Sequence, residues 1–201
     1  YDREPLKGYE ARLTEVLEDV RDFYKTGMSE QGFSGATYDY ARDAEGKIAF
    51  HVVTGKRRKR DYSRKTSREI LNEVKVHMAK KGLDCDKETV VVFQNLAVWT
   101  DTTFSDLDAP YFGGWSGLGG FCWVVDFPFF KTENLTRKQP IMTMNSDSRR
   151  SLGAILSSQM GGVAHELGHS FRLPHSHQDP GAGKNSLMGY GNWTYGEDRR
   201  G

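Results

Sequence analysis

Four of the chain's six histidines lie within thirteen positions, in the stretch GGVAHELGHSFRLPHSH. If this stretch is helical, His165 and His169 are one turn apart, so their imidazoles project from the same side and can bind one ion. His175 follows six residues later and supplies a third nitrogen. Three histidines that leave a fourth position open to water are typical of catalytic zinc. The spacing therefore predicts a Zn²⁺ site made of His165, His169 and His175.

Glu166 stands next to the first of these histidines. Its place along the helix makes it an inconvenient fourth ligand, but it can take a proton from a water activated by the metal and pass that proton to a leaving amine. A His-Glu-x-x-His pattern arises by chance in about one sequence in a hundred of this composition. We therefore expect Glu166 to be the general base of a hydrolytic reaction.

The segment HELGHSFRLPH, residues 165–175, resembles the zinc-binding signature of the metzincins, His-Glu-x-x-His-x-x-Gly-x-x-His. It matches four of the five fixed positions. Arg172 stands where the family has the glycine that turns the chain back toward the third histidine, and arginine in that left-handed conformation costs on the order of 1 kcal/mol. Pro174 ends the helix before His175 in any case. His175 is therefore the expected third ligand.

Two further residues stay open as alternatives for that third ligand, His177 and Asp179. Other zinc peptidases take their third ligand from a downstream glutamate. The only glutamate after His169 is Glu197, in a glycine-bracketed tail, so this alternative is weak.

The stretch NSLMGYG, residues 185–191, resembles the methionine-containing turn after which the metzincins are named, and Met188 lies at its centre. Tyr190 resembles the tyrosine that some metzincin subfamilies direct at the metal or the reacting carbonyl. The resemblance thus implies a structural role for Met188 and a catalytic role for Tyr190.

The elements that must position these residues can be read from hydrophobic periodicity. Apolar residues at helical spacing predict a helix over residues 8–28, and a capping pattern at Thr66 and Glu69 opens a second helix that ends near Gly82. Alternating and β-branched residues predict strands over residues 47–55 and 89–99. After a polar loop to about Arg150, a third helix carries the zinc motif.

A glycine-rich segment leads into FCWVVDF, residues 121–127, which reads as a short strand. So much glycine before a strand favours an exposed edge, and an exposed edge can hold an extended peptide by main-chain hydrogen bonds. By resemblance to the substrate-aligning strand of metzincins, we predict that residues 121–127 form this edge, with a covered strand as the alternative.

The composition excludes several classes of function. With 37% hydrophobic and 27% charged residues and a formal net charge of +1, the chain is predicted to be an ordinary globule rather than a nucleic-acid-coating protein. The basic run KRRKR, residues 56–60, lacks interleaved aromatics and reads as a solvated loop, so no nucleic-acid partner is expected. No apolar run is long enough to span a membrane.

Two points stay open at the sequence level. Cys85 and Cys122 can form one disulfide or remain thiols. The acidic loop from Asp101 to Asp108 admits Ca²⁺, although such carboxylates are more often plain loop residues.

Together these patterns predict an α/β (α+β) zincin or metzincin-like fold: a mixed twisted sheet with an antiparallel edge strand, two long helices and an active-site helix. We expect residues 1–201 to form a single catalytic domain, with an upper subdomain over about 1–171 and a short lower one over about 172–201. The predicted function is a zinc endopeptidase acting on peptides or proteins, outside the cytoplasm by resemblance, with the oligomeric state undetermined. The alternative is an inactive or latent zinc-binding module that recognises peptides.

Overall fold

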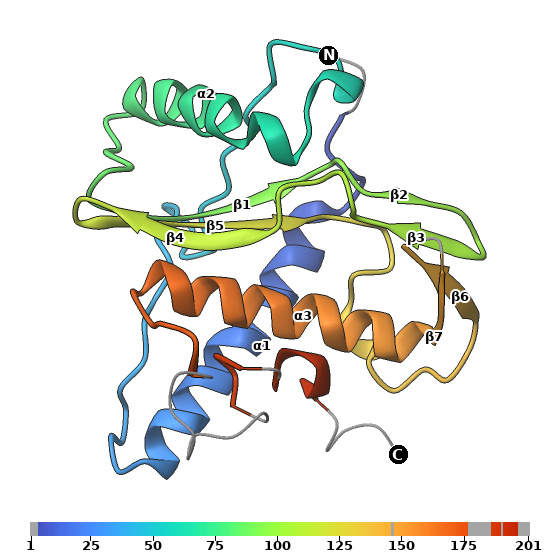
Figure 1. The fold of residues 1–201 in the computed structure, drawn as a ribbon. Coiled ribbons are helices and arrows are strands. Elements are labelled where there is room, and N and C mark those ends of the chain that lie inside the picture. The colour runs from blue at the N-terminus through green and yellow to red at the C-terminus, as the bar shows by residue number, and fades with distance from the viewer. Residues whose placement is uncertain (1–3, 146, 177–185, 190, 197–201) are drawn as a thin grey trace.

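The computed structural model describes residues 4–145, 147–176, 186–189 and 191–196 (Figure 1). Its three α-helices are those that periodicity predicts. They are α1 (Tyr9–Glu30), α2 (Ser67–Ala79) and α3 (Leu152–Ser170). Short 3₁₀ turns connect the elements at Lys59–Asp61, Arg64–Thr66, Thr132–Asn134 and Gly191–Thr194.

Three strands form the main sheet, in the order β1-β5-β4. They are β1 (Thr89–Gln94), β4 (Phe112–Ser116) and β5 (Gly119–Val125). β1 runs parallel to β5, with Thr89 opposite Gly120, and β4 runs antiparallel to β5 and forms one of the two edges. The predicted mixed sheet with an antiparallel edge strand is therefore confirmed.

The helices cover both faces of this sheet. In Figure 1, α2 lies over one face of the sheet. α3 lies against the other face, and α1 passes behind α3 in this view. α3 is buried on almost every side because the sheet, α1 and the 3₁₀ turn at Gly191–Thr194 surround it. Its apolar residues Ile155, Leu156, Met160, Val163, Ala164 and Leu167 form the centre of the hydrophobic core.

A second, smaller sheet has the order β2-β3-β6-β7. Its strands are β2 (Val98–Trp99), β3 (Thr103–Ser105), β6 (Ile141–Met144) and β7 (Ser148–Ser151). β7 leads directly into α3, whose first turn is capped by Ser151, since the Ser151 hydroxyl accepts a hydrogen bond from the Ala154 N–H at 3.2 Å. The small sheet therefore fixes where the metal-motif helix begins.

The strand predicted over residues 47–55 is wrong. This segment is irregular, and its strand-like contact is a single bridge between Ile48 and Arg42. The alternating apolar residues pack one by one instead: Ile48 is buried, and Phe50 meets the ring of Tyr9 edge-on. Val52, the third apolar residue of the alternation, is 45% exposed, so the alternation marks neither a strand nor one continuous buried face.

Two other strand predictions need correction. The predicted strand over residues 89–99 is two strands, β1 and β2, which belong to different sheets. FCWVVDF is not the edge, because β5 lies between β1 and β4 and is covered on both sides. The edge strand next to β5 that pairs with it antiparallel is β4, and its sequence FGGWS is too rich in glycine to show strand periodicity.

Among the residues that the structure describes, no helix has the length and apolar character needed to cross a membrane.

Candidate metal centre

Three imidazoles from two segments meet at the end of α3. His165 and His169 lie on successive turns of the helix, and His175 follows the turn that ends it. Their Nε2 atoms form a triangle: His165 to His169 is 3.1 Å, His165 to His175 is 3.3 Å and His169 to His175 is 3.0 Å. In the described part of the chain, this is the group of His, Cys, Asp and Glu side chains that could hold a metal ion.

In two of these rings, the hydrogen bond of Nδ1, the nitrogen that faces away from the triangle, determines the tautomer. His165 Nδ1 lies 2.7 Å from the Leu187 carbonyl oxygen, and His169 Nδ1 lies 2.8 Å from the Leu173 carbonyl oxygen. Since a carbonyl oxygen only accepts, each Nδ1 carries the proton and donates it. In the neutral rings, both Nε2 atoms therefore present lone pairs.

Two lone pairs at 3.1 Å repel each other unless a cation lies between them. Three Nε2 ligands around a tetrahedral zinc at the usual bond length would lie about 3.3 Å apart, which is close to the 3.0, 3.1 and 3.3 Å found here. The backbone carbonyls behind the rings are the outer-shell partners that orient histidine ligands in metal sites. The residues present therefore fit a zinc ion.

Arg172 makes the turn that brings His175 back to the helix. Its φ of 69° lies in the left-handed region, as the family's glycine would. The Leu173 N–H donates to the Gly168 carbonyl at 3.0 Å and the Arg172 N–H donates to the His169 carbonyl at 2.9 Å, which closes the helix end. Arg172 thus adopts the left-handed conformation for which the motif has a glycine, and it does so at a cost in strain.

Glu166 points from α3 toward the edge strand. Its Oε2 accepts a hydrogen bond from the Gly113 N–H of β4 at 2.5 Å. Burial raises the pKa of the Glu166 carboxyl above its ordinary value, while the Gly113 hydrogen bond acts in the opposite direction. The Glu166 carboxylate thus lies at the open edge of β4, on the residue next to His165. A carboxylate in such a position can accept or donate a proton.

β4 and α3 approach each other unusually closely at this point. A Cβ on Gly113 would lie 1.8 Å from the Glu166 carbonyl oxygen, so only glycine fits. Sequence reasoning missed Gly113, and the one signal for it was the Gly-Gly pair within a segment that read as a loop. The carbonyls of Leu173 and Leu187 were also missed, because backbone acceptors leave no mark on residue type.

Met188 lies in a turn beneath the helix, where it is buried. The Gly189 N–H donates to the Ser186 carbonyl at 2.9 Å, and the Met188 carbonyl accepts from the Ser176 N–H at 3.0 Å. The Met188 sulfur would lie 2.5 Å from a Cβ on Gly168, so the methionine packs directly against α3 between the two helix ligands. The same turn supplies the Leu187 carbonyl that orients His165.

The structure treats the remaining site candidates as follows. Tyr190, His177, Asp179 and Glu197 lie outside the described residues. The carboxylates of the loop from Asp101 to Asp108 do not converge on a metal-ligand group, so the structure offers no support for Ca²⁺ there. Both cysteines are free thiols, and the Cys122 thiol is buried against the Val163 carbonyl.

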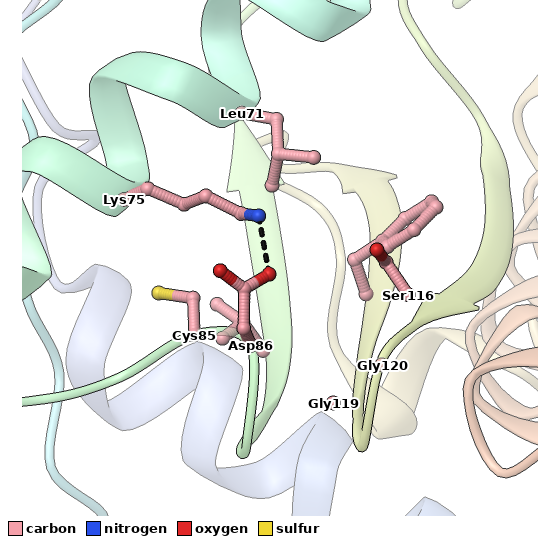
Figure 2. Close-up of a pocket in the computed structure, with 9 residues that line it drawn as sticks. Leu71, Lys75, Cys85, Asp86, Ser116, Gly119 and Gly120 are labelled. Atoms are coloured by element: carbon pink, nitrogen blue, oxygen red, sulfur yellow. Dashed lines mark hydrogen bonds and ion pairs between the residues drawn. The ribbon is translucent and has the colours of Figure 1, made fainter.

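A small hollow lies on the face of the main sheet that α2 covers, opposite the face that α3 covers (Figure 2). Lys75 of α2 forms an ion pair with Asp86 there at 2.5 Å, next to Cys85 and the start of β5. None of its lining residues belongs to the histidine triangle, and Ser116 and Gly119, which flank the β4–β5 turn, are among them.

No protein-family model and no curated protein matches this sequence. Solved structures do match. The crystal structure of wild-type OgpA from Akkermansia muciniphila has a TM-score of 0.73 at 25% identity, covering 97% of this chain and 52% of that one. A second crystal form of wild-type OgpA gives 0.72. Catalytically inactive OgpA in complex with an O-glycopeptide substrate, glycodrosocin, gives 0.68. The chain spans about half the length of OgpA and has the same α/β fold in that half.

Proposed function

We propose that this chain is a zinc-dependent endopeptidase, and that O-glycosylated peptides are its substrates. The observation that carries the proposal is the triangle of Nε2 atoms 3.0, 3.1 and 3.3 Å apart, with the Glu166 carboxylate on the next residue of the same helix. The likeness to OgpA supports a peptidase-related function, and the O-glycopeptide bound to the inactive OgpA supports the substrate class.

A zinc ion, when bound by His165, His169 and His175, supplies Lewis-acid chemistry that polarises a peptide carbonyl and lowers the pKa of a water molecule. The chain's own residues do the rest. The Glu166 carboxylate accepts the proton from the attacking water and delivers it to the leaving amine nitrogen. The Leu187 and Leu173 carbonyls accept hydrogen bonds from the outer nitrogens of His165 and His169, and so orient both rings with Nε2 toward the centre of the triangle.

β4 is the element that would align the substrate. It has a strand neighbour on one side only, and the Gly113 N–H points away from that neighbour toward Glu166. By the alternation of an antiparallel strand, the backbone groups of Trp115 also point outward. An extended peptide can therefore add to this edge by main-chain hydrogen bonds, which brings its scissile carbonyl beside Glu166.

The test is cleavage of a pair of synthetic peptides with one sequence, one of them carrying an O-linked sugar on a single serine or threonine. We expect the zinc-loaded chain to cut the glycopeptide, a chelator to stop the cutting and added zinc to restore it. Glu166→Gln should bind zinc normally and cut at least about 100-fold more slowly, since proton transfer of this kind contributes roughly 10²–10⁴-fold. Glu133→Gln, which changes an exposed glutamate far from the triangle, is the matched control.

Mass spectrometry of the products separates the outcomes. Equal cleavage of both peptides would leave the peptidase but remove the sugar from the proposal. Zinc binding without cleavage of either peptide would contradict the enzyme and favour a binding module. We also propose an extracytoplasmic location, on the basis of the family resemblance alone.

A further inference from the structure

Arg172 is where the sequence departs from the family motif, and its side chain has a partner that a glycine would not have. The Arg172 guanidinium donates a hydrogen bond to the carbonyl oxygen of Gly117. Gly117 lies in the two-residue turn between β4 and β5, with a φ of 63°. One residue therefore ends the metal helix with its backbone and contacts the hairpin of the edge strand with its side chain.

That hairpin is held differently on its two arms. On the β5 side, the Gly119 N–H donates to the Asp86 carbonyl at 2.7 Å and the Gly120 N–H donates to the Glu88 carbonyl at 3.1 Å. Figure 2 shows this side, where Gly119 and Gly120 lie beside Asp86. A Cβ on Gly120 would also lie 2.3 Å from the Ser170 carbonyl, so β5 is pressed against the end of α3.

On the β4 side, the strand pairs with β5 as far as Ser116, and Gly113, four residues before Gly117, donates a hydrogen bond to Glu166 of α3. Four residues of strand span about 13 Å. The end of β4 beyond Gly113 is exposed, since Trp115 presents 52% of its surface, and so is the turn that follows, where Leu118 presents 78%. Gly113 and Trp115 share the face of β4 that looks toward α3, because strand residues two apart point the same way.

We propose that Arg172 is a positioning residue that ties the β4–β5 turn to the end of the metal helix, and so fixes the end of β4 that carries Trp115. The part that concerns substrate rests on the proposed function. The strained backbone of Arg172 is then tolerated because its side chain stabilises the β4–β5 turn. A glycine would remove the strain and the tie together.

The test compares three variants of the full chain. Arg172→Gly removes the strain and the tie, Arg172→Ala keeps the strain and removes the tie, and Arg172→Lys keeps a donor on a chain of similar length. Hydrogen exchange of the amides over residues 114–118 reads the hairpin directly and does not need enzyme activity. Zinc binding and thermal unfolding are measured on the same samples.

We expect Arg172→Gly and Arg172→Ala to exchange these amides roughly tenfold faster than wild type, the change that follows loss of one hydrogen bond. Arg172→Lys should restore part of the protection, and zinc affinity should stay unchanged in all three. Arg172→Gly should be the more stable of the two variants without the tie, because it alone is free of strain.

With a cleavable peptide, KM should rise roughly tenfold in the variants without the tie, while kcat stays within about twofold, because Gly113 still anchors β4 at Glu166. Exchange at the wild-type rate in both Arg172→Gly and Arg172→Ala would overturn the proposal, since Arg172 would then act through its backbone alone. A wild-type chain that cuts no peptide would contradict the proposed function, and the exchange data would still decide the role of Arg172.

Discussion

At the scale of single residues, the histidine triangle includes backbone acceptors as well as imidazoles. The Leu187 and Leu173 carbonyls hold the protons of His165 and His169 on the outer nitrogens, which leaves the inner nitrogens ready for a metal. The two carbonyls come from different turns, one from the turn that carries Met188 and one from the turn after Arg172. The orientation of the two rings therefore depends on both turns.

Replacing any one of the three histidines with alanine should weaken zinc binding by more than the roughly 10–100-fold that loss of an outer-shell partner produces. The reason is that each variant removes a direct ligand. Competition with a zinc-binding dye measures the effect. His51→Ala is the matched control, because His51 lies outside the triangle and its loss should leave zinc affinity unchanged. Unchanged affinity after loss of His175 would move the third ligand to a residue outside those described.

At the scale of elements, the contact between β4 and α3 holds the Glu166 carboxylate at the strand edge. Gly113→Ala should destabilise the fold by about 1–3 kcal/mol or more, because its Cβ would meet the backbone carbonyl of Glu166, which cannot move without moving the helix. Chemical denaturation measures the change, and cleavage should fall with it because the Gly113 N–H leaves Glu166.

The neighbouring glycine gives the control for that substitution. A Cβ on Gly114 would lie 2.9 Å from the ring edge of Phe121, a side chain that can rotate away. Gly114→Ala should therefore lower the free energy of unfolding less than Gly113→Ala. Equal effects of the two changes would mean that the clash with α3 is absent and that the strand as a whole resists any side chain there.

The same elements show what the sequence could predict. α1, α2 and α3 follow from apolar periodicity and capping, which are local, and the zinc motif lies on a helix that those rules predict. The order of strands is not local: β5 looks like an edge from its glycine-rich approach and is central because β1 pairs with it in parallel. No strand pattern is visible in FGGWS, because glycine has low strand propensity and Gly113 is required by the close approach of α3.

The role of the Arg172 side chain is not local either. The motif shows that Arg172 takes the place of a glycine, but the Gly117 carbonyl that its side chain contacts lies 55 residues earlier in the chain. A local sequence pattern cannot reveal a partner so distant, and it therefore cannot predict how this turn is stabilised.

At the scale of the whole molecule, one buried ion pair joins the amino-terminal helix to the sheet that carries the site. Arg12 of α1 contacts both carboxylate oxygens of Asp126, just after β5, with a shortest distance of 2.7 Å. Only 5% and 7% of these two side chains are exposed. Burial raises the pKa of the Asp126 carboxyl above its ordinary value even though the Arg12 guanidinium opposes the shift.

Arg12→Met should lower the free energy of unfolding by about 3–5 kcal/mol at neutral pH, because it leaves a carboxylate buried without its partner. A raised folded-state pKa means that the contribution of Asp126 to stability is fully present below its unfolded pKa of about 3.9 and is lost as the pH rises through the folded value. Without Arg12 that pKa rises further, so the loss is larger and extends to higher pH. The difference in unfolding free energy between wild type and Arg12→Met should therefore shrink as the pH falls from about 7 toward about 4.

Urea denaturation of both chains across that pH range measures this difference. The control is the same Arg12→Met change made in an Asp126→Asn background, where the titrating carboxyl is gone and the difference should not depend on pH. A difference that stays constant with pH in the Asp126 background would show that Arg12 stabilises the fold by packing its methylene groups against α1 and the sheet. In that case the attachment of α1 to the site-bearing sheet would be apolar, and the charge pair would contribute nothing that a methionine could not replace.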